Sequence, residues 1–487
     1  MTETEKISTT RPITTSADKT KIPLRRVLGL PTGILLVAGI MIGSGVFKKI
    51  TPMSAMLMNE SYIIVAWIIA GLITMLGAFL IAGLATTTTE TGGVYEYLRI
   101  SVGNFFSFLY GWALLTIAGS GAIAALAFIF SQSLNTLIHF PDPLHHLEKI
   151  SIANFVFPFA GSGVKIIAVA TICLLTWVNY RGAKNGGVLN NIVTTAKILG
   201  IALLIVLGLI YSDSSATKAV NATTSNHISG TSLVSALFGA MLSAFWAYDG
   251  WANVSFVSGE IKNPKRNVPI AIVAGLSIAM ILYVLLNYAF MQVLPLNELA
   301  SVGENNIAAA VVAQHLMGKA GTVVISVLIA VSTFGALNAC IIVYPRIYYR
   351  MAQENFFFRQ LANVHPVFQT PYVALVLSMI WSCLLTISGT FDLLTNLVIF
   401  AGFFFYILLA LGLIRMKRKG LITTKLIGHP VPSVIIILFS LVLIINTVVV
   451  QTKQSVIGLF LLLSGVPVYY YFKSRNQKLL KSREDKS

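Results

Sequence analysis

The chain has 487 residues, of which 56% are hydrophobic and only 10% are charged. This composition excludes a soluble protein of that length and is typical of a polytopic helical membrane protein. The net charge of +17 does not indicate a nucleic-acid partner, because most Lys and Arg residues lie in tails and loops that flank long apolar runs.

The first long apolar run is interrupted near its middle by Gly43, Ser44 and Gly45. Residues 1–27 before it are rich in Thr, Lys and Arg, and we expect them to form a disordered tail. Glycine costs a helix about 1 kcal/mol per position relative to alanine. In lipid, unpaired backbone groups are tolerated only where they are buried in protein or line a cavity. We therefore predict a broken helix whose second half directs its first amides and its positive dipole end toward an anion.

Apolar runs and turn signals along the chain predict twelve membrane-spanning helices. Their approximate limits are 29–57, 62–86, 104–134, 163–181, 190–211, 233–258, 268–293, 320–345, 371–389, 393–414, 431–451 and 455–472. The sixth span repeats the anomaly of the first, since Asp249 and Gly250 interrupt an apolar run. Two interrupted helices, five spans apart, are the sequence mark of an inverted-repeat transporter.

These features predict an all-α membrane protein with a 5+5 inverted repeat of the LeuT type and two additional helices at the C-terminus. The expected parts are the tail at 1–27, a first repeat at 28–212, a second repeat at 213–430, the additional helices at 431–472 and a basic tail at 473–487. Spans one and six are the broken helices. Because five is odd, the two repeats must insert with opposite orientation.

The distribution of the 34 Lys and Arg residues predicts the orientation. Most of them fall on the side of the N-terminus, and only Lys197 is left deep inside a span. The opposite side receives Lys48, Lys49, Lys149, Lys165, Lys218, Lys319 and Lys453. Cytoplasmic loops carry the excess of positive charge, so both termini are expected in the cytoplasm of a cell that holds the protein in its plasma or inner membrane.

Four sequence blocks resemble the amino acid–polyamine–organocation superfamily, most closely its L-type exchangers of neutral amino acids. They are GIMIGSGVF at 39–47, ETGGVYEYL at 90–98, WAYDGWANVSFVSGEIKNPKRNVP at 246–269 and FGALNACIIVYPRIYYRMA at 334–352, and the resemblance extends over about residues 28–472. It implies a sodium-independent exchanger of small neutral L-amino acids that works by alternating access. Proton-coupled symport, and exchange of cationic amino acids or polyamines, remain as alternatives.

The resemblance also implies a substrate site between the two breaks. Ile42, Gly43, Ser44 and Gly45 would hold the α-carboxylate, and carbonyl groups near Trp246, Ala247 and Asp249 would hold the α-amino group. The same arrangement follows from helix dipoles, because a zwitterion fits between a helix N-terminus and a helix C-terminus. Trp246 stands where relatives usually carry the Phe that closes over the substrate, so it is the expected gate.

Two buried charges have alternative interpretations. Asp249 is either the counter-ion of a cationic substrate or the N-cap of a helix that restarts after the break; we favour the cap. Lys197 would be costly in the membrane without a partner. The resemblance places its ammonium where sodium-coupled relatives bind sodium, tying the first helix to the eighth. Ala336 and Cys340 stand where relatives often have hydroxyl residues, so its partner in helix eight is open, and carbonyls of the first break are a substitute.

The sequence predicts neither an enzyme nor a bound cofactor or metal. All seven histidines fall outside the spans, and the group of Asp142, His145, His146 and Glu148 is expected to be a solvated loop. Cys173, Cys340 and Cys383 lie in apolar runs, where they act as small buried hydrophobic residues. The expected partners are an amino acid substrate and the lipid bilayer, without nucleic acid and without an obligate protein subunit.

Overall fold

The computed structural model describes residues 28–85, 87, 93–151, 157–181, 186–211, 230–303, 306–422 and 428–484. The predicted tail at 1–27 lies outside these residues. In this part of the chain the only β-bridge pairs Leu28 with Ile261. The all-α fold class is therefore confirmed.

The α-helices follow one another as α1 (Leu30–Met41), α2 (Gly45–Lys48), α3 (Ile50–Leu57), α4 (Glu60–Ala85), α5 (Gly93–Ser101), α6 (Asn104–Ala113), α7 (Gly119–Leu137), α8 (Ser162–Tyr180), α9 (Gly186–Ile210), α11 (Gly230–Tyr248), α12 (Pro264–Val293), α13 (Leu296–Ala300), α14 (Ala308–Gln353), α15 (Tyr372–Ser388), α16 (Phe391–Arg418), α17 (Val431–Val450), α18 (Thr452–Leu463) and α19 (Gly465–Glu484). Within the described ranges, 11 helical segments are long and apolar enough to cross a membrane, and α15 is a shorter apolar helix. They follow the order of the twelve predicted spans. The number of crossings and the inverted repeat stay predictions.

Both predicted interruptions are present. Residues 42–44 separate α1 from α2, and α3 follows α2 directly after Lys49. The second interruption follows Tyr248, where Gly250 has a φ of 98° that side-chain-bearing residues rarely adopt. The chain continues there as a 3-10 helix, η3 (Trp251–Glu260), rather than as the α-helix that we predicted.

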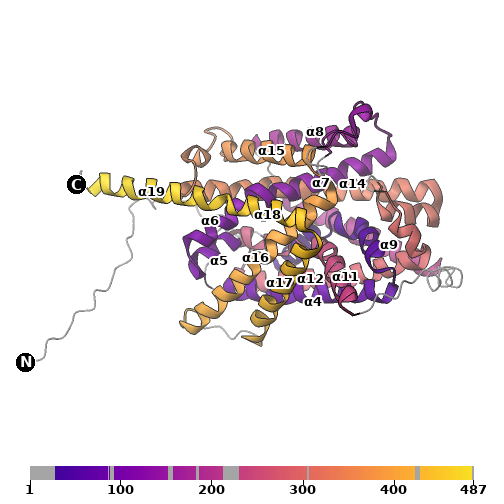
Figure 1. The fold of residues 1–487 in the computed structure, drawn as a ribbon, viewed down its shortest axis with the longest axis horizontal. Coiled ribbons are helices and arrows are strands. Elements are labelled where there is room, and N and C mark those ends of the chain that lie inside the picture. The colour runs from indigo at the N-terminus through magenta and orange to yellow at the C-terminus, as the bar shows by residue number, and fades with distance from the viewer. Residues whose placement is uncertain are drawn as a thin grey trace, which may run out of the picture.

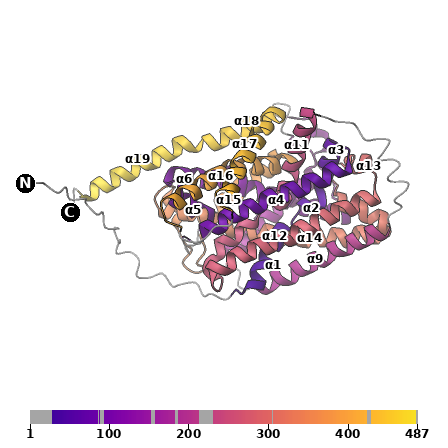
Figure 2. The same cartoon turned by 90° about the horizontal axis from the view of Figure 1, so that it is seen from below.

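The helices form one bundle around α1, α7, α12 and α14. Helix α1 packs against α12 and α9, α7 packs against α14 and α8, and α4 packs against α12 and α11. Figure 1 shows α8 and α15 side by side along one margin of the bundle, and their packing agrees with this view. In Figure 2, α5 and the end of α19 lie at one end of the bundle, and α3 and α13 lie at the other. We call these the α5 end and the α13 end.

The third predicted span contains a local change of helix type. Helices α6 and α7 are joined by a π-helical turn, η1 (Leu114–Ala118). Such turns are rare and occur frequently at functional sites. The first turns of α7, which follow it directly, line the cavity described below.

Lys197 is not the only lysine buried in the bundle. Lys48, Lys49 and Lys165, which we predicted on the outer side of the membrane, are exposed to only 4%, 0% and 7%. Each has a partner on another segment: Gln132 for Lys48, Asp392 for Lys49 and the carbonyl of Ile387 for Lys165. A buried charge is tolerated when it is paired and hydrogen-bonded, and such partners are invisible in a count of charges along the sequence.

Candidate substrate site

The two helix breaks meet in the middle of the bundle. A Cβ atom added to Gly45 would lie 2.5 Å from the Cα of Ala247, a distance that real Cβ atoms do not show. A Cβ atom on Gly250 would lie 2.7 Å from the Cγ2 of Ile40. The start of α2 therefore touches the end of α11, and glycine at both positions permits this approach.

The carbonyl groups of the first break are occupied by side chains from three other helices. Lys197 Nζ donates to the oxygen of Gly39 (3.0 Å), Tyr283 Oη donates to the oxygen of Met41 (2.7 Å) and Ser332 Oγ donates to the oxygen of Ile42 (3.0 Å). The sequence analysis identified Lys197 but missed Tyr283 and Ser332. A tyrosine or a serine inside an apolar run carries no sequence signal that distinguishes this role from ordinary packing.

The amides of the four residues predicted to hold the carboxylate differ in their hydrogen bonding. Ile42 and Gly43 donate their amides to the oxygens of Ala38 and Met41. For the amides of Ser44 and Gly45, the described part of the chain shows no backbone acceptor. The first amides of a helix have no acceptor inside that helix, and they form a favourable place for an anion. The sequence predicted that the second half of the broken helix directs its first amides toward an anion. The amides of Ser44 and Gly45 are the ones that fit this prediction.

A cavity of about 40 Å³ lies between the two breaks. Its lining consists of Ile40, Met41, Gly43, Ser44, Gly45, Ala122, Leu126, Trp246, Asp249, Gly250, Asn253, Ala336, Cys340 and Tyr344. Five of the seven predicted substrate residues are in this lining. Ile42 is fully buried outside it, and Ala247 packs against Gly45. Helix α11 ends at this cavity, so the negative end of its dipole lies there, although the oxygen of Trp246 already accepts from the amide of Asp249 at 3.3 Å.

Trp246 lines the cavity and contacts both breaks. Its Nε1 donates to Ser44 Oγ at 3.1 Å, which joins the two breaks directly. The ring meets Phe391 edge to face, with 6.1 Å between the ring centroids. Only 7% of the side chain is exposed. Trp246 is therefore buried at the predicted site, and its role as a gate stays a prediction.

Asp249 lies between this cavity and a second cavity of about 30 Å³. The amide of Gly250 donates to its carboxylate. Within the described residues no Lys, Arg or His forms an ion pair with it. The predicted cap is only partly realised, because the helix that follows is a 3-10 helix and the contact shown is with the adjacent residue.

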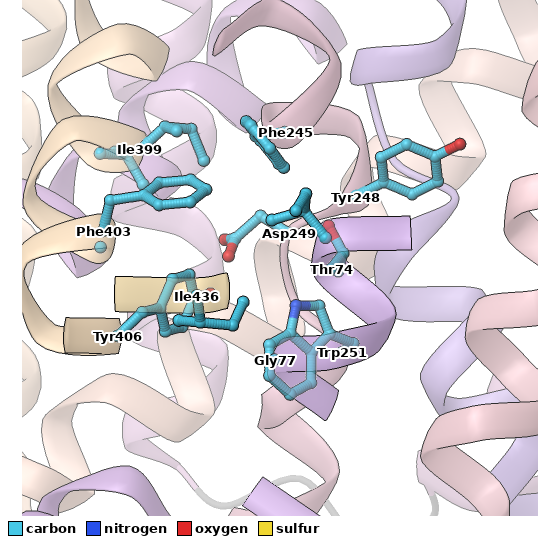
Figure 3. Close-up of a pocket in the computed structure, with 13 residues that line it drawn as sticks. Thr74, Gly77, Phe245, Tyr248, Asp249, Trp251, Ile399, Phe403, Tyr406 and Ile436 are labelled. Carbon is cyan, nitrogen blue, oxygen red and sulfur yellow. The ribbon is translucent and has the colours of Figure 1, made fainter. Parts of the chain in front are cut away.

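The second cavity is aromatic. Figure 3 shows the carboxylate of Asp249 directed toward Phe403 and Tyr406 of α16. Trp251 stacks on Tyr406 with 6.0 Å between the ring centroids, and Phe245 meets Phe403 at 4.6 Å. A carboxylate beside aromatic faces is an environment that suits a cation or a proton.

Lys197 is buried against the first broken helix. Its side chain is 3% exposed, and its Nζ contacts the oxygen of Gly39 one turn before the break. Thr194, one turn earlier on α9, fills the space that a side chain at position 39 would need. Helix α14 reaches the same break separately through Ser332, so Ala336 and Cys340 take no part in this contact.

The group of Asp142, His145 and Glu148 lies on the surface of a loop. Their ligand atoms lie within 4.8 Å of one another. Asp142 already accepts hydrogen bonds from the backbone amide and the hydroxyl of Ser162, and His145 lies 2.8 Å from Glu148. The loop is held by these contacts, and it is remote in sequence from the two breaks.

Comparison with known proteins gives the family of this fold. The sequence profile of the amino acid permease family matches residues 28–470, which is nearly the whole chain. The chain belongs to the amino acid permease family. The permease is 31% identical over 458 residues to the serine/threonine exchanger SteT of Bacillus subtilis, with 93% of this chain and 98% of SteT covered.

Two human proteins are also similar. The b(0,+)-type amino acid transporter 1 is 29% identical and covers 92% of the permease and 88% of its own length. The large neutral amino acids transporter small subunit 2 is 27% identical, and the match covers 92% of the permease and 81% of that protein. The superfamily resemblance found in the sequence is thereby confirmed.

Proposed function

We propose that the permease exchanges small neutral L-amino acids across the membrane by alternating access, without sodium. The observation that carries this proposal is the meeting of the two breaks at Gly45 and Ala247. On one side of the contact, the amides of Ser44 and Gly45 have no backbone acceptor in the part of the chain that the structure describes. On the other, Trp246 and Asp249 at the end of α11 line the same cavity. An α-amino acid carries an anionic carboxylate and a cationic amino group close together, so backbone groups alone can bind it.

The size of the cavity favours a small side chain. About 40 Å³ holds only a few water-sized groups, and the ring of Trp246 forms part of its lining. The similar Bacillus protein is named for the exchange of serine and threonine. Serine and threonine are therefore the first substrates to test.

The contact between Lys197 and Gly39 supports transport without sodium. The ammonium group of Lys197 already occupies a carbonyl one turn before the first break, and a carbonyl is the type of ligand that a sodium ion would use. The charge is part of the chain and cannot be released. The coupling of transport to sodium would need a second cation in the same place.

We further propose that the α5 end faces the cytoplasm, where both termini lie, and that the protein resides in the cell membrane. Most Lys and Arg residues fall in the tails and loops that the sequence analysis assigns to the side of the N-terminus. The permease acts as a transporter rather than an enzyme, and it works without a protein subunit. The last point is open to a direct test, because one relative is named as a small subunit.

Asp249 supports a second candidate function. An acid that has no basic partner in the described residues, placed beside aromatic rings, could hold the cationic side chain of a basic amino acid or a polyamine. It could equally carry a proton and couple uptake to a proton gradient. Transport of a cationic substrate and proton-coupled uptake both require the carboxylate of Asp249, whereas exchange of neutral amino acids does not.

The deciding experiment is uptake by purified protein in liposomes. Vesicles preloaded with a mixture of neutral amino acids should take up labelled serine, in the presence or absence of sodium, while empty vesicles should not. Uptake into empty vesicles driven by a proton gradient would replace exchange with symport. Uptake of lysine or putrescine, but not of serine, would replace the neutral substrate with a cationic one.

A further inference from the structure

The loop between α7 and α8 carries three side chains of the kinds that bind metal ions. Asp142, His145 and Glu148 each offer one ligand atom, and these atoms all lie within 4.8 Å of one another. Among the described residues, no other group of three or more such side chains comes this close. None of the three lines the cavity between the helix breaks, so the proposed function does not use them.

The backbone of the loop explains why these side chains meet. The amide of His145 donates to the oxygen of Asp142 at 3.2 Å, and the amide of Glu148 donates to the oxygen of His145 at 3.1 Å. Each bond closes a three-residue turn, and the second turn contains the 3-10 helix η2 (His145–Leu147). Side chains at positions i and i+3 of such turns stand one above the other. The sequence D-x-x-H-x-x-E therefore presents an acid, a histidine and an acid along one edge of the loop.

One of the three ligands is held in place by α8. Asp142 Oδ1 accepts hydrogen bonds from the amide of Ser162, at 3.0 Å, and from the hydroxyl of the same residue. Ser162 is the first residue of α8, which lies along one margin of the bundle (Figure 1). Carboxylates that bind metals usually have an outer partner of this kind, which fixes their orientation. Asp142 thus joins the cluster to the helical bundle.

The other two ligands are open to solvent and can adjust. The side chain of His145 is 72% exposed and that of Glu148 is 38% exposed, and His145 Nδ1 lies 2.8 Å from Glu148 Oε2. Neighbouring ligand atoms of a tetrahedral zinc ion lie about 3.3 Å apart, because each is about 2.0–2.1 Å from the metal. Ligand atoms that are up to 4.8 Å apart have to approach by roughly 1.5 Å at most. A change of rotamer in an exposed side chain covers this distance.

The charges around the cluster favour a divalent cation. Two carboxylates and one imidazole supply the negative charge that such an ion needs. The ammonium group of Lys165 interacts with Asp142 over a longer distance, but it donates to three backbone carbonyls and not to the cluster. Within the described residues, Lys149 forms no ion pair with either acid.

The ligand set also selects among metal ions. One nitrogen ligand and two carboxylates are typical of zinc sites in which water fills the fourth position. Calcium takes about six to eight oxygen ligands, and magnesium requires a nearly ideal octahedral shell. Three ligands that include an imidazole suit neither of these ions.

We propose that Asp142, His145 and Glu148 form a binding site for a zinc ion, with water as the fourth ligand. The metal replaces the direct contact between His145 and Glu148, and it fastens η2 to the first turn of α8 through Asp142. In the proposed topology this loop lies on the outer side of the membrane. Binding requires no transported substrate.

Cobalt binding to the purified full-length protein tests the site directly. Co²⁺ takes the same ligands as zinc, and its visible absorption changes with its coordination. The purification tag is removed before the titration, and zinc is then added in competition. The ligand variants are Asp142→Asn, His145→Gln and Glu148→Gln. The matched control is His146→Gln, because His146 is an exposed histidine of the same turn that lies off the edge with the three ligands.

We expect the unmodified chain and His146→Gln to bind cobalt, and zinc to displace it from both. Each ligand variant should weaken zinc binding by at least about tenfold, because even the outer partner of a ligand contributes about ten- to a hundredfold. Ser162→Ala, which removes such an outer partner, should weaken it by about tenfold. Absence of binding by the unmodified chain, or equal binding by His145→Gln and His146→Gln, would overturn the proposal. Calcium that displaces cobalt as well as zinc does would also overturn it.

A melting experiment separates metal binding from a structural role of the same side chains. In detergent, zinc should raise the melting temperature of the unmodified chain and of His146→Gln by a few degrees, and it should leave the ligand variants unchanged. Ligand variants that melt early without zinc, yet gain as much from zinc as the unmodified chain, would show a structural role only. Failure of the protein to transport any amino acid would contradict the proposed function and would leave the zinc result unaffected.

Discussion

The contact between Gly45 and Ala247 makes Gly45→Ala the most informative single change. The new methyl group would lie 2.5 Å from the Cα of Ala247 and 2.9 Å from its nitrogen. Ordinary contacts between such atoms lie near 3.5–4.0 Å. The two breaks would therefore have to separate by roughly 1 Å to accept one methyl group.

That displacement predicts two measurable effects. Overpacking of a tight contact costs about 1–3 kcal/mol of stability, so the melting temperature of the purified protein in detergent should fall by several degrees. A misplacement of about 1 Å between substrate-binding groups can lower a rate by about a hundredfold. Counterflow of serine should accordingly fall far more than the amount of folded protein.

Gly335→Ala is the matched control. Gly335 lies within α14, where an added Cβ would meet nothing closer than Val193 at 4.0 Å. Alanine is the better helix former there by about 1 kcal/mol, so this variant should be as stable as the unmodified chain and fully active. Normal counterflow and normal melting in Gly45→Ala would refute the close approach of the breaks, and with it the central site.

Three further variants test individual side chains. Lys197→Ala should remain folded, because the hydrogen bond lost at Gly39 and the burial cost of the ammonium are each about 2–3 kcal/mol and offset one another. Counterflow of serine should nevertheless fall by at least about tenfold. Wild-type turnover would show that Lys197 has no part in the mechanism. Trp246→Ala should slow exchange by roughly tenfold and admit bulkier neutral amino acids in competition assays, since the cavity loses its cover; unchanged rates and selectivity would leave the residue a packing role. Asp249→Asn should keep exchange of serine and should not alter proton movement, measured with a pH-sensitive dye inside the vesicles; loss of a proton flux present in the unmodified chain would establish symport instead.

Most of the fold was predictable because membrane helices are selected by length and apolarity. The predicted spans 62–86 and 431–451 differ from α4 and α17 by only one or two residues. The extent of α14 was not predictable in the same way. It covers 46 residues in all, with a kink at Gly318, whereas the predicted span covers only 320–345.

The site was predictable at its glycines and not at its supporting side chains. Gly45 and Gly250 stand out because glycine in an apolar run is unfavourable for a helix, so the sequence itself marks the breaks. Tyr283 and Ser332 cap carbonyls that lie 242 and 290 positions away in the chain. No local pattern records such a pairing, since a hydroxyl in an apolar helix satisfies itself equally well on its own backbone.

The burial of Lys48 and Lys49 also depends on contacts that are distant in the sequence. Lys48 and Lys49 follow an apolar run, and the sequence analysis placed them on the outer side of the membrane without predicting that they are buried. Their burial depends on Asp392, which follows Lys49 by 343 positions and belongs to another helix. Breaking such a pair by removing one partner costs more than removing both, because the remaining charge is buried alone. Lys49→Met with Asp392→Leu should thus be more stable than either single change, while transport from the α13 end is lost in all three; additive destabilisation in the double variant would show that the two side chains do not act as a pair.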